Sequence, residues 1–350
     1  MDEIQLIQQL SSANGVSGFE DEVVAICKNQ LHDTCEITED SLRNLIFSLK
    51  TNTGKPRIWL DAHMDEVGFM VSRLNPNGTL GFLPLGGWDP GVIPASKVRV
   101  QQLDGTYLAG IVATTPPHYL KQSEPADKPT IQNMVIDVGA ITRGEHHIGL
   151  GAPIVPDVAC TYDDERKLFL GKAFDCRIGV AALIETVKQA STLNLDVDIV
   201  GTLSAQEEVG IRGISSVAKT LEADIAIVFE GCPADDTFEH RDMAQTALYK
   251  GPMLRHFDRC MITNPRFMRH TINLAKSQNI PLQEAVRSGG GTSAAYIHTA
   301  KNGIPTIVIG VPVRYAHTHH GFTSLEDYQN TVKLAVAVLK SLNDEVIKSF

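Results

Sequence analysis

The sequence lacks the features that would assign it to several common functional classes. It has no excess of basic residues, because 31 Lys and Arg against 41 Asp and Glu give a formal net charge of −10. A nucleic-acid-binding surface is therefore not expected, since binding phosphates requires concentrated positive charge. No apolar run approaches the roughly 18–20 residues of a membrane-spanning helix. We therefore expect neither a nucleic-acid partner nor a membrane partner.

Cysteine is also sparse. The six cysteines form no Cys-x-x-Cys pair and show no regular spacing. The segment from Met1 to Leu6 lacks the basic residues and apolar core of a signal peptide. We therefore expect reduced thiols in the cytoplasm. Cys176 and Cys232 lie near candidate ligands in the sequence, and their simplest interpretation is that of small buried packing residues.

What the sequence does contain is enough apolar material for two domains. It has 350 residues, of which 43% are hydrophobic and 21% charged. The order of predicted elements indicates an α/β domain formed by residues 1–66 and 164–350, interrupted by a β-rich domain at 67–163. In the inserted part, turn signals separate short strand-like runs. Outside it, strands and helices alternate, which is typical of a mostly parallel sheet covered by helices on both faces.

Individual elements of the α/β part can be predicted from periodicity. The strands are expected at 44–49, 56–62, 168–170, 197–203, 225–229 and 305–310, and the helices at 3–12, 18–31, 178–190, 213–220, 265–277 and 325–347. Ser17 is the predicted N-cap of the second helix.

Two adjacent glutamates are the most informative motif. Glu207 and Glu208 directly follow the predicted buried strand at 197–203. Carboxylates at such a place are costly to desolvate unless a metal ion or another partner compensates them. Because adjacent side chains point in different directions, one carboxylate can bind a metal while the other acts as a general base on water. The alternative is a solvated acidic turn at the start of a helix.

Other metal-binding side chains also follow predicted strands: His63, Asp65, Asp175, Glu230 and His317. Ligands of open α/β sheets lie beyond the carboxyl ends of the strands, and His with carboxylate is a ligand set for zinc or a similar divalent ion. Singly, each residue has a plainer interpretation, such as a structural histidine, a helix N-cap or a solvated strand end. Together they predict a metallohydrolase.

Two further motifs are less decisive. Three histidines at 317, 319 and 320 compete for one ligand position, and all three could instead be solvated. The glycine-rich loop at 289–293 lacks the Lys of a Walker motif and does not match a dinucleotide fingerprint, so no nucleotide site is expected there.

Four segments in combination resemble the glutamyl aminopeptidase and tetrahedral aminopeptidase family of di-metal exopeptidases. They lie at residues 62–68, 172–179, 206–213 and 314–317, in the order found in the family, and the resemblance extends over nearly the whole chain. It implies a three-layer α/β/α peptidase domain with an inserted, small β-barrel-like domain. It also implies two divalent ions per chain, zinc or cobalt, and a homo-oligomer that is commonly a dodecamer.

The resemblance implies a role for each candidate residue. His63 and Glu230 would bind one ion, Glu208 and His317 the other, Asp175 would bridge both, Asp65 would support His63, and Glu207 would be the general base. The family usually has Asp at the position of Glu230, Asn or Asp at that of Cys176, and Asp at that of Ser293.

The function expected from these observations is removal of N-terminal residues from short peptides. Two alternatives remain open: a catalytically weak assembly protein that binds peptides, and an amidohydrolase of acylated small molecules. Arg287, which precedes the glycine-rich loop, is a candidate for pairing with an acidic substrate side chain through bidentate hydrogen bonds. Its alternative role is that of a solvated surface arginine.

Overall fold

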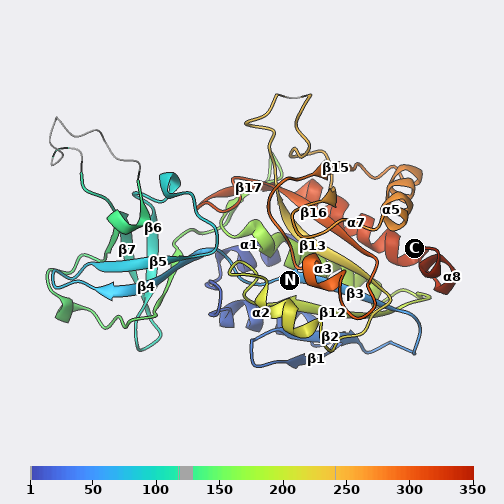
Figure 1. Ribbon diagram of the computed structural model, residues 1–350, viewed down its shortest axis with the longest axis horizontal. Coiled ribbons are helices and arrows are strands. Elements are labelled where there is room, and N and C mark those ends of the chain that lie inside the picture. Colours follow the sequence, from blue (N-terminus) through green and yellow to red (C-terminus); the bar gives the residue numbers. More distant parts are fainter. Residues whose placement is uncertain (1, 117, 119–128, 241) are drawn as a thin grey trace.

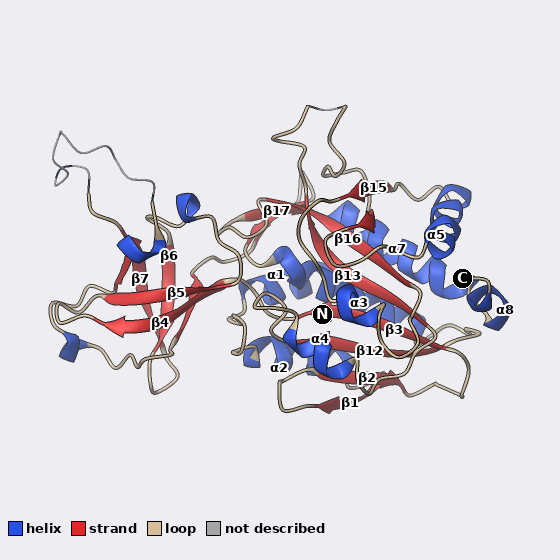
Figure 2. Cartoon of the chain, in the orientation of Figure 1, coloured by secondary structure: helices blue, strands red, loops and turns tan. Residues whose placement is uncertain are grey.

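The structure is a computed structural model, and it describes residues 2–116, 118, 129–240 and 242–350. A large α/β domain and a smaller β barrel lie side by side (Figure 1). The large domain has a sheet with helices packed on it, and the barrel consists of strands joined by loops and short helical turns (Figure 2). The predicted fold class is therefore confirmed.

One mixed sheet of 11 strands organises the α/β domain. Along its main path the order is β1-β2-β12-β3-β13-β16-β17-β11-β10, while β14 pairs with β15 and β16. Strand β3 runs parallel to both β12 and β13, and β13 runs parallel to β16. The bounds are β1 (Cys35–Glu39), β2 (Leu45–Leu49), β3 (Arg57–His63), β10 (Thr161–Asp163), β11 (Leu168–Gly171), β12 (Asp198–Ser204), β13 (Ile225–Pro233), β14 (Met253–Phe257), β15 (Gln283–Val286), β16 (Thr306–Arg314) and β17 (Gly321–Ser324).

The central strands are buried on both faces, which produces three layers. In β3, Ile58 and Leu60 belong to one apolar cluster and Trp59 to another on the opposite face. This alternation follows from the two-residue period of a strand. Helices α1 (Glu3–Ser12), α2 (Asp21–Leu31), α3 (Phe174–Ala190), α5 (Pro265–Ser277) and α7 (Leu325–Ser341) contribute to the first cluster, and α4 (Arg212–Val217) and α6 (Ala294–Ile297) to the second.

Two predictions about helices are wrong. The predicted helix at 325–347 is two helices, because Leu342 is extended and Asn343 caps α8 (Asp344–Lys348) with its side chain. Ser17 is not a helix N-cap, since α2 starts later and Glu20 precedes it. The Ser17 hydroxyl instead donates a hydrogen bond of 2.6 Å to Asp65. A residue assigned to local structure thus contacts the candidate site.

The barrel closes in the order β4-β5-β8-β7-β6-β9. Its strands are β4 (Gly68–Leu74), β5 (Leu80–Leu85), β6 (Lys97–Gln101), β7 (Tyr107–Ala113), β8 (Val135–Asp137) and β9 (Pro153–Pro156). It has its own apolar core, which includes Phe69, Phe82 and Ile154. Residues 161–163, which the sequence grouped with this insertion, form β10 and pair with β11 in the large sheet. No helix in the described ranges is long and apolar enough to cross a membrane.

Candidate metal centre

The candidate site lies where parallel strands of the large sheet end. His63 is the last residue of β3, Glu207 and Glu208 follow β12, and Glu230 lies within β13. Because these strands are parallel neighbours, their carboxyl ends meet at one edge of the sheet. Residues separated by up to 167 positions are thereby gathered in one place.

Asp175 lies between two histidines. Its Oδ1 atom is 3.3 Å from His63 Nε2, and its Oδ2 atom is 3.3 Å from His317 Nε2. The carboxylate therefore presents one oxygen to each side, which is the arrangement needed to bridge two ions. Asp175 occupies a non-helical first turn of α3.

Each histidine also faces a second carboxylate. Glu208 Oε2 lies 3.2 Å from His317 Nε2, and Glu230 Oε2 lies 3.7 Å from His63 Nε2. The structure therefore brings together all five predicted metal ligands, with one His, one Glu and the shared Asp175 on each side. Whether these residues bind metal is a prediction that this geometry supports.

Asp65 connects the two halves of the site. Its Oδ1 lies 3.3 Å from His63 Nδ1 and accepts a hydrogen bond of 2.9 Å from the Glu207 amide. Its Oδ2 accepts hydrogen bonds from Ser17 Oγ (2.6 Å) and from the Glu208 amide (3.1 Å). Burial raises the pKa of Asp65, but contacts with His63 and these hydrogen bonds outweigh burial and hold that pKa below its usual value. Asp65 is thus an ionised support for His63.

His317 is held by the inserted domain. Its Nδ1 donates a hydrogen bond of 2.9 Å to the Gly87 carbonyl, which lies in the segment after β5. A hydrogen bond at Nδ1 leaves Nε2 free to bind a metal. A Cβ at Gly87 would lie 3.3 Å from His317 Nδ1, so glycine permits the close approach. His319 is instead buried, with its ring centroid 5.1 Å from that of Trp88, and His320 is exposed.

Strained backbone occurs directly beside the candidate ligands. Ala173, Gln206, Tyr315 and His317 all have positive φ values between 54° and 63°, although none is glycine. Such conformations persist only where surrounding contacts enforce them, and they cluster at functional sites. The buried Glu20 carboxylate is one such contact, because it accepts a hydrogen bond of 3.1 Å from the Gln206 amide. The turn that carries both glutamates is therefore preorganised.

The electrostatics of the cluster indicate that it is built for cations. Burial raises the pKa of Glu230 to about 8, and burial also raises the pKa of Glu207 well above its usual range. One oxygen of the buried Glu208 carboxylate, Oε1, has no hydrogen-bond partner among the described residues. An unpartnered buried carboxylate oxygen is costly, and a divalent ion would remove that cost. The donor set therefore fits a metal such as zinc.

A cavity of about 900 Å³ opens over this cluster. His63, Asp175, Glu207, Glu208 and Glu230 line it, together with His317, the loop at 288–292 and three arginines, Arg255, Arg259 and Arg287. No described residue hydrogen-bonds to the Glu207 carboxylate, so this group is free to act on a molecule in the cavity. A volume of this size accommodates a short peptide.

Arg287 lines the cavity but already has protein partners. Its guanidinium bonds Asp235 at 2.7 Å, Thr246 Oγ1 at 2.6 Å and the Pro233 carbonyl at 3.3 Å. It is therefore not the solvated surface arginine considered from the sequence. Its pairing with an acidic substrate stays a prediction. Arg259, which the sequence analysis did not select, is exposed and forms no ion pair with any residue that the structure describes.

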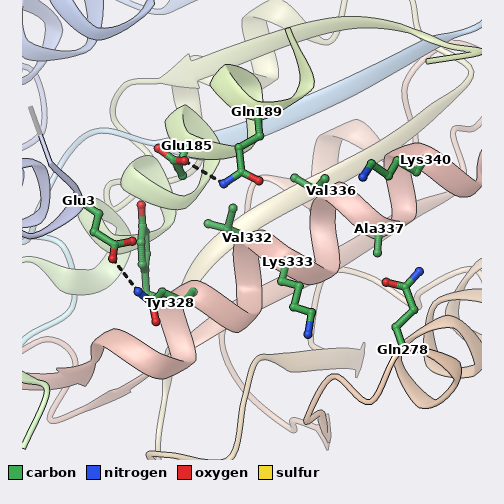
Figure 3. Close-up of a pocket in the computed structure, with 11 residues that line it drawn as sticks. Glu3, Glu185, Gln189, Gln278, Tyr328, Val332, Lys333, Val336, Ala337 and Lys340 are labelled. Carbon is green, nitrogen blue, oxygen red and sulfur yellow. Dashed lines mark hydrogen bonds between the residues drawn. The ribbon is translucent and has the colours of Figure 1, made fainter. Parts of the chain in front are cut away.

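A second hollow, of about 480 Å³, lies between α1, α3 and α7 on the outer face (Figure 3). Its walls carry Glu, Gln and Lys side chains, four of which are already paired in the hydrogen bonds Gln329 to Glu3 and Gln189 to Glu185. None of the His/Cys/Asp/Glu clusters found among the described residues lies there. We therefore do not regard it as the functional site.

The arrangement of an α/β/α domain with a His and carboxylate cluster under a peptide-sized cavity is that of a hydrolytic enzyme. The chain belongs to the M42 glutamyl aminopeptidase family, whose sequence pattern matches residues 43–334. The resemblance seen in the sequence is thereby confirmed, and with it the assignment of an aminopeptidase hydrolase.

Three similar proteins illustrate the relationship. The glutamyl aminopeptidase of Lactococcus lactis subsp. cremoris is 29% identical over 97% of both chains. The crystal structure of the TET aminopeptidase from the marine sediment archaeon Thaumarchaeota archaeon SCGC AB-539-E09 is 37% identical, covers 99% of both chains and has a TM-score of 0.94. The Pyrococcus horikoshii TET1 peptidase, whose structure describes assembly into a tetrahedron or a large octahedral shell, is 26% identical, with 97% and 100% coverage and a TM-score of 0.87.

Replacing individual histidines tests the choice of ligand. We expect His317→Ala to lower the metal content by about one ion per chain under saturating zinc, because Nε2 of His317 faces both Asp175 and Glu208. His319→Ala is the control, and it should leave the metal content unchanged because His319 faces Trp88. Elemental analysis of the two purified variants measures the difference. Loss of metal from the His319 variant alone would show that the assignment of His317 is wrong.

Proposed function

We propose that this aminopeptidase acts with two divalent ions per chain and that Glu207 is its general base. His63 and Glu230 would hold one ion, Glu208 and His317 the other, and Asp175 would bridge the two. The observation that carries the proposal is the position of Asp175, whose two oxygens each lie 3.3 Å from a different histidine. We expect zinc or cobalt, because the donors are imidazole and carboxylate in a buried setting.

Each residue of the site contributes one step. Divalent ions, when bound here, would supply Lewis-acid polarisation of the scissile carbonyl and a lowered pKa for water. Glu207 takes the proton of the attacking water and returns it to the leaving amine. Asp65 contributes indirectly, because it positions both the His63 imidazole and the Glu207 amide. The substrates are short peptides that fit the cavity of about 900 Å³.

The variant Glu207→Gln tests the general base. The amide is nearly isosteric but cannot accept a proton, so metal content should stay unchanged while kcat falls by roughly 10⁴-fold or more, as for a group that acts as a unit with its water. Glu36→Gln, an exposed change on β1, is the control and should keep full activity. The assay uses aminoacyl anilides, with N-acyl amino acids beside them.

The same assay separates the alternatives. Hydrolysis of N-acyl amino acids in preference to anilides would identify an amidohydrolase. Peptide binding without turnover, at full metal content, would identify a peptide-binding assembly protein. Near-normal kcat in pure Glu207→Gln would show that Glu207 is not the general base.

We further propose that arginine at the cavity wall favours an acidic N-terminal residue. Arg259 is the better placed of the two candidates, since the Arg287 guanidinium is bound by Asp235 and Arg259 has no ion pair with the residues described. Glutamyl and aspartyl anilides should then be cleaved faster than leucyl anilide. Arg259→Ala should reduce that preference at least about tenfold, because a hydrogen bond to a charged group contributes roughly 1.5–3 kcal/mol.

Arg287→Ala is the matched variant for this comparison. It should change glutamyl and leucyl turnover equally, because Arg287 supports the wall through Asp235 and Thr246. If Arg287→Ala instead removes the preference for acidic residues, Arg287 is the residue that pairs with the acidic substrate side chain, as the sequence suggested. A leucyl preference in the unmodified enzyme would contradict the acidic proposal altogether.

We propose that the chain assembles into a homo-oligomer, with twelve chains as the expected number. The related TET1 peptidase is described as forming a tetrahedron or an octahedral shell. On the barrel of this chain, Leu103, Ile141 and Leu150 are 81%, 79% and 69% exposed, and Leu103 packs against Gly149, next to Leu150. Exposed apolar side chains that lie together are typical of association surfaces.

Light scattering at micromolar concentration tests the assembly. We expect a mass close to twelve chains, and Leu150→Asp should lower it because burying a carboxylate in a contact is costly. Asn29→Asp, an exposed change on α2 that also adds one negative charge, is the control. A monomer mass for the unmodified protein would contradict the proposal. We also place the protein in the cytoplasm, where its six free thiols, five of them buried, would stay reduced.

A further inference from the structure

A buried thiol lies among the candidate ligands of one side of the site. The ligand atoms of His63, Cys176 and Glu230 all lie within 4.8 Å of one another. All three residues are buried, and Cys176 is 0% exposed. They come from different elements, since His63 ends β3, Cys176 is in the first turn of α3 and Glu230 is in β13. Three independent elements therefore direct metal-binding atoms to one point.

Cys176 has polar contacts in addition to those of a packing residue. Its Sγ donates a hydrogen bond of 3.2 Å to the Phe229 carbonyl, directly beside Glu230. Cys176 packs in the apolar core of the α/β domain, and its thiol also lies within 4.8 Å of an imidazole nitrogen and a carboxylate oxygen. The thiol is therefore placed to join His63 and Glu230 as a donor.

We propose that Cys176 binds, as a thiolate, the ion held by His63 and Glu230. The inference rests on the metal part of the proposed function. On binding, the sulfur gives up its proton to solvent, loses its hydrogen bond to Phe229, and donates a lone pair to the ion. Release of protons accompanies metal binding by thiols in general. With Asp175 as the bridge, this side has one nitrogen, one sulfur and two carboxylate donors, whereas the other side has only nitrogen and oxygen.

The two ions consequently differ in kind. A thiolate donor favours zinc, cobalt and softer ions over magnesium or manganese. The side with Glu208 and His317 has no sulfur among its donors, so it accepts harder ions and exchanges them more readily. The enzyme should fill its sites in order, with a zinc or cobalt ion first on the Cys176 side. A second, different ion can then complete the pair.

Cobalt spectroscopy on the full-length protein tests the thiolate. After removal of metal with a chelator, the first equivalent of Co²⁺ should produce a near-ultraviolet thiolate-to-cobalt charge-transfer band, which carboxylates and imidazoles do not produce. Cys176→Ser should abolish the band and weaken binding of the first cobalt by more than the roughly 10–100-fold typical of losing a supporting group. Cobalt content is measured in the same samples.

Cys232→Ser is the matched control. Cys232 is equally buried and lies two residues after Glu230, but its Sγ faces Arg255 at 3.6 Å and belongs to neither donor cluster. This variant should keep the band. Bound cobalt without a band in the unmodified protein, or a band that survives Cys176→Ser, would overturn the role of Cys176 while leaving the two-ion proposal intact. Absence of any bound cobalt would instead overturn both.

A measurement without substitutions covers the case in which the serine variant does not fold. X-ray absorption at the zinc edge of the unmodified protein, loaded with one zinc per chain, should show one sulfur at about 2.3 Å. Loading with a second zinc should halve the average sulfur number per zinc. A first shell of nitrogen and oxygen alone would show that Cys176 is not a ligand.

Discussion

Concentrated negative charge in a buried place is the constraint on which the rest of the structure depends. Asp175, Glu207, Glu208 and Glu230 line one cavity, and Asp65 lies 3.3 Å from His63 Nδ1. Among the residues that the structure describes, the basic side chains within 4 Å of these carboxylates are His63 and His317. Carboxylates that are desolvated together repel one another and take up protons unless cations compensate them. The cluster is therefore only half of a stable arrangement. On the two-ion proposal, the fold must hold the carboxylates rigidly enough for the ions to bind.

A buried ion network beneath the cluster supplies that rigidity. Glu66 pairs with both Lys172 and Arg177, and all three side chains are almost completely buried. The Arg177 guanidinium donates to the carbonyls of Met64, Leu10 and Gly15, and Lys172 donates to that of Ala13. The end of α1, the end of β3 and the start of α3 are thereby tied together. His63 and Asp175 extend from those tied segments, so their spacing follows from the network.

The sequence predicted the parts of the fold that depend on periodicity. Strands β3, β12, β13 and β16 are apolar runs bounded by polar residues. The candidate ligands were found because they lie at or just after the ends of these runs. Short or mixed strands such as β14 (Met253–Phe257) and β15 (Gln283–Val286) were not predicted. Their residues include Arg, His and Glu, and they are held by strand pairing, β14 on β16 and β15 on β14. Tertiary pairing of this kind leaves no local pattern.

Candidate residues could be predicted where the type of side chain itself indicates the chemistry. They could not be predicted where the role depends on a contact with the backbone or with a residue distant in the sequence. Glu207 and Glu208 stand out as adjacent acids after a strand. Nothing local shows that Ser17 would bind Asp65, because a serine before a helix has the pattern of an N-cap. Arg287 has the same difficulty, since its partner Asp235 is 52 positions away. Residue type indicates what a side chain can bind, and only the fold shows which partner is present.

The inserted barrel contributes directly to the candidate site. It leaves the α/β domain immediately after Asp65 and begins β4 at Gly68, so the barrel is anchored at the ligand strand itself. The Gly87 carbonyl of the inserted domain accepts a hydrogen bond from Nδ1 of His317, and the Trp88 ring lies against His319. A tilt of the barrel would therefore move the His317 imidazole relative to Asp175. Contacts on the barrel surface would restrain such a tilt, so the proposed assembly through the barrel would also stabilise the geometry of the candidate site.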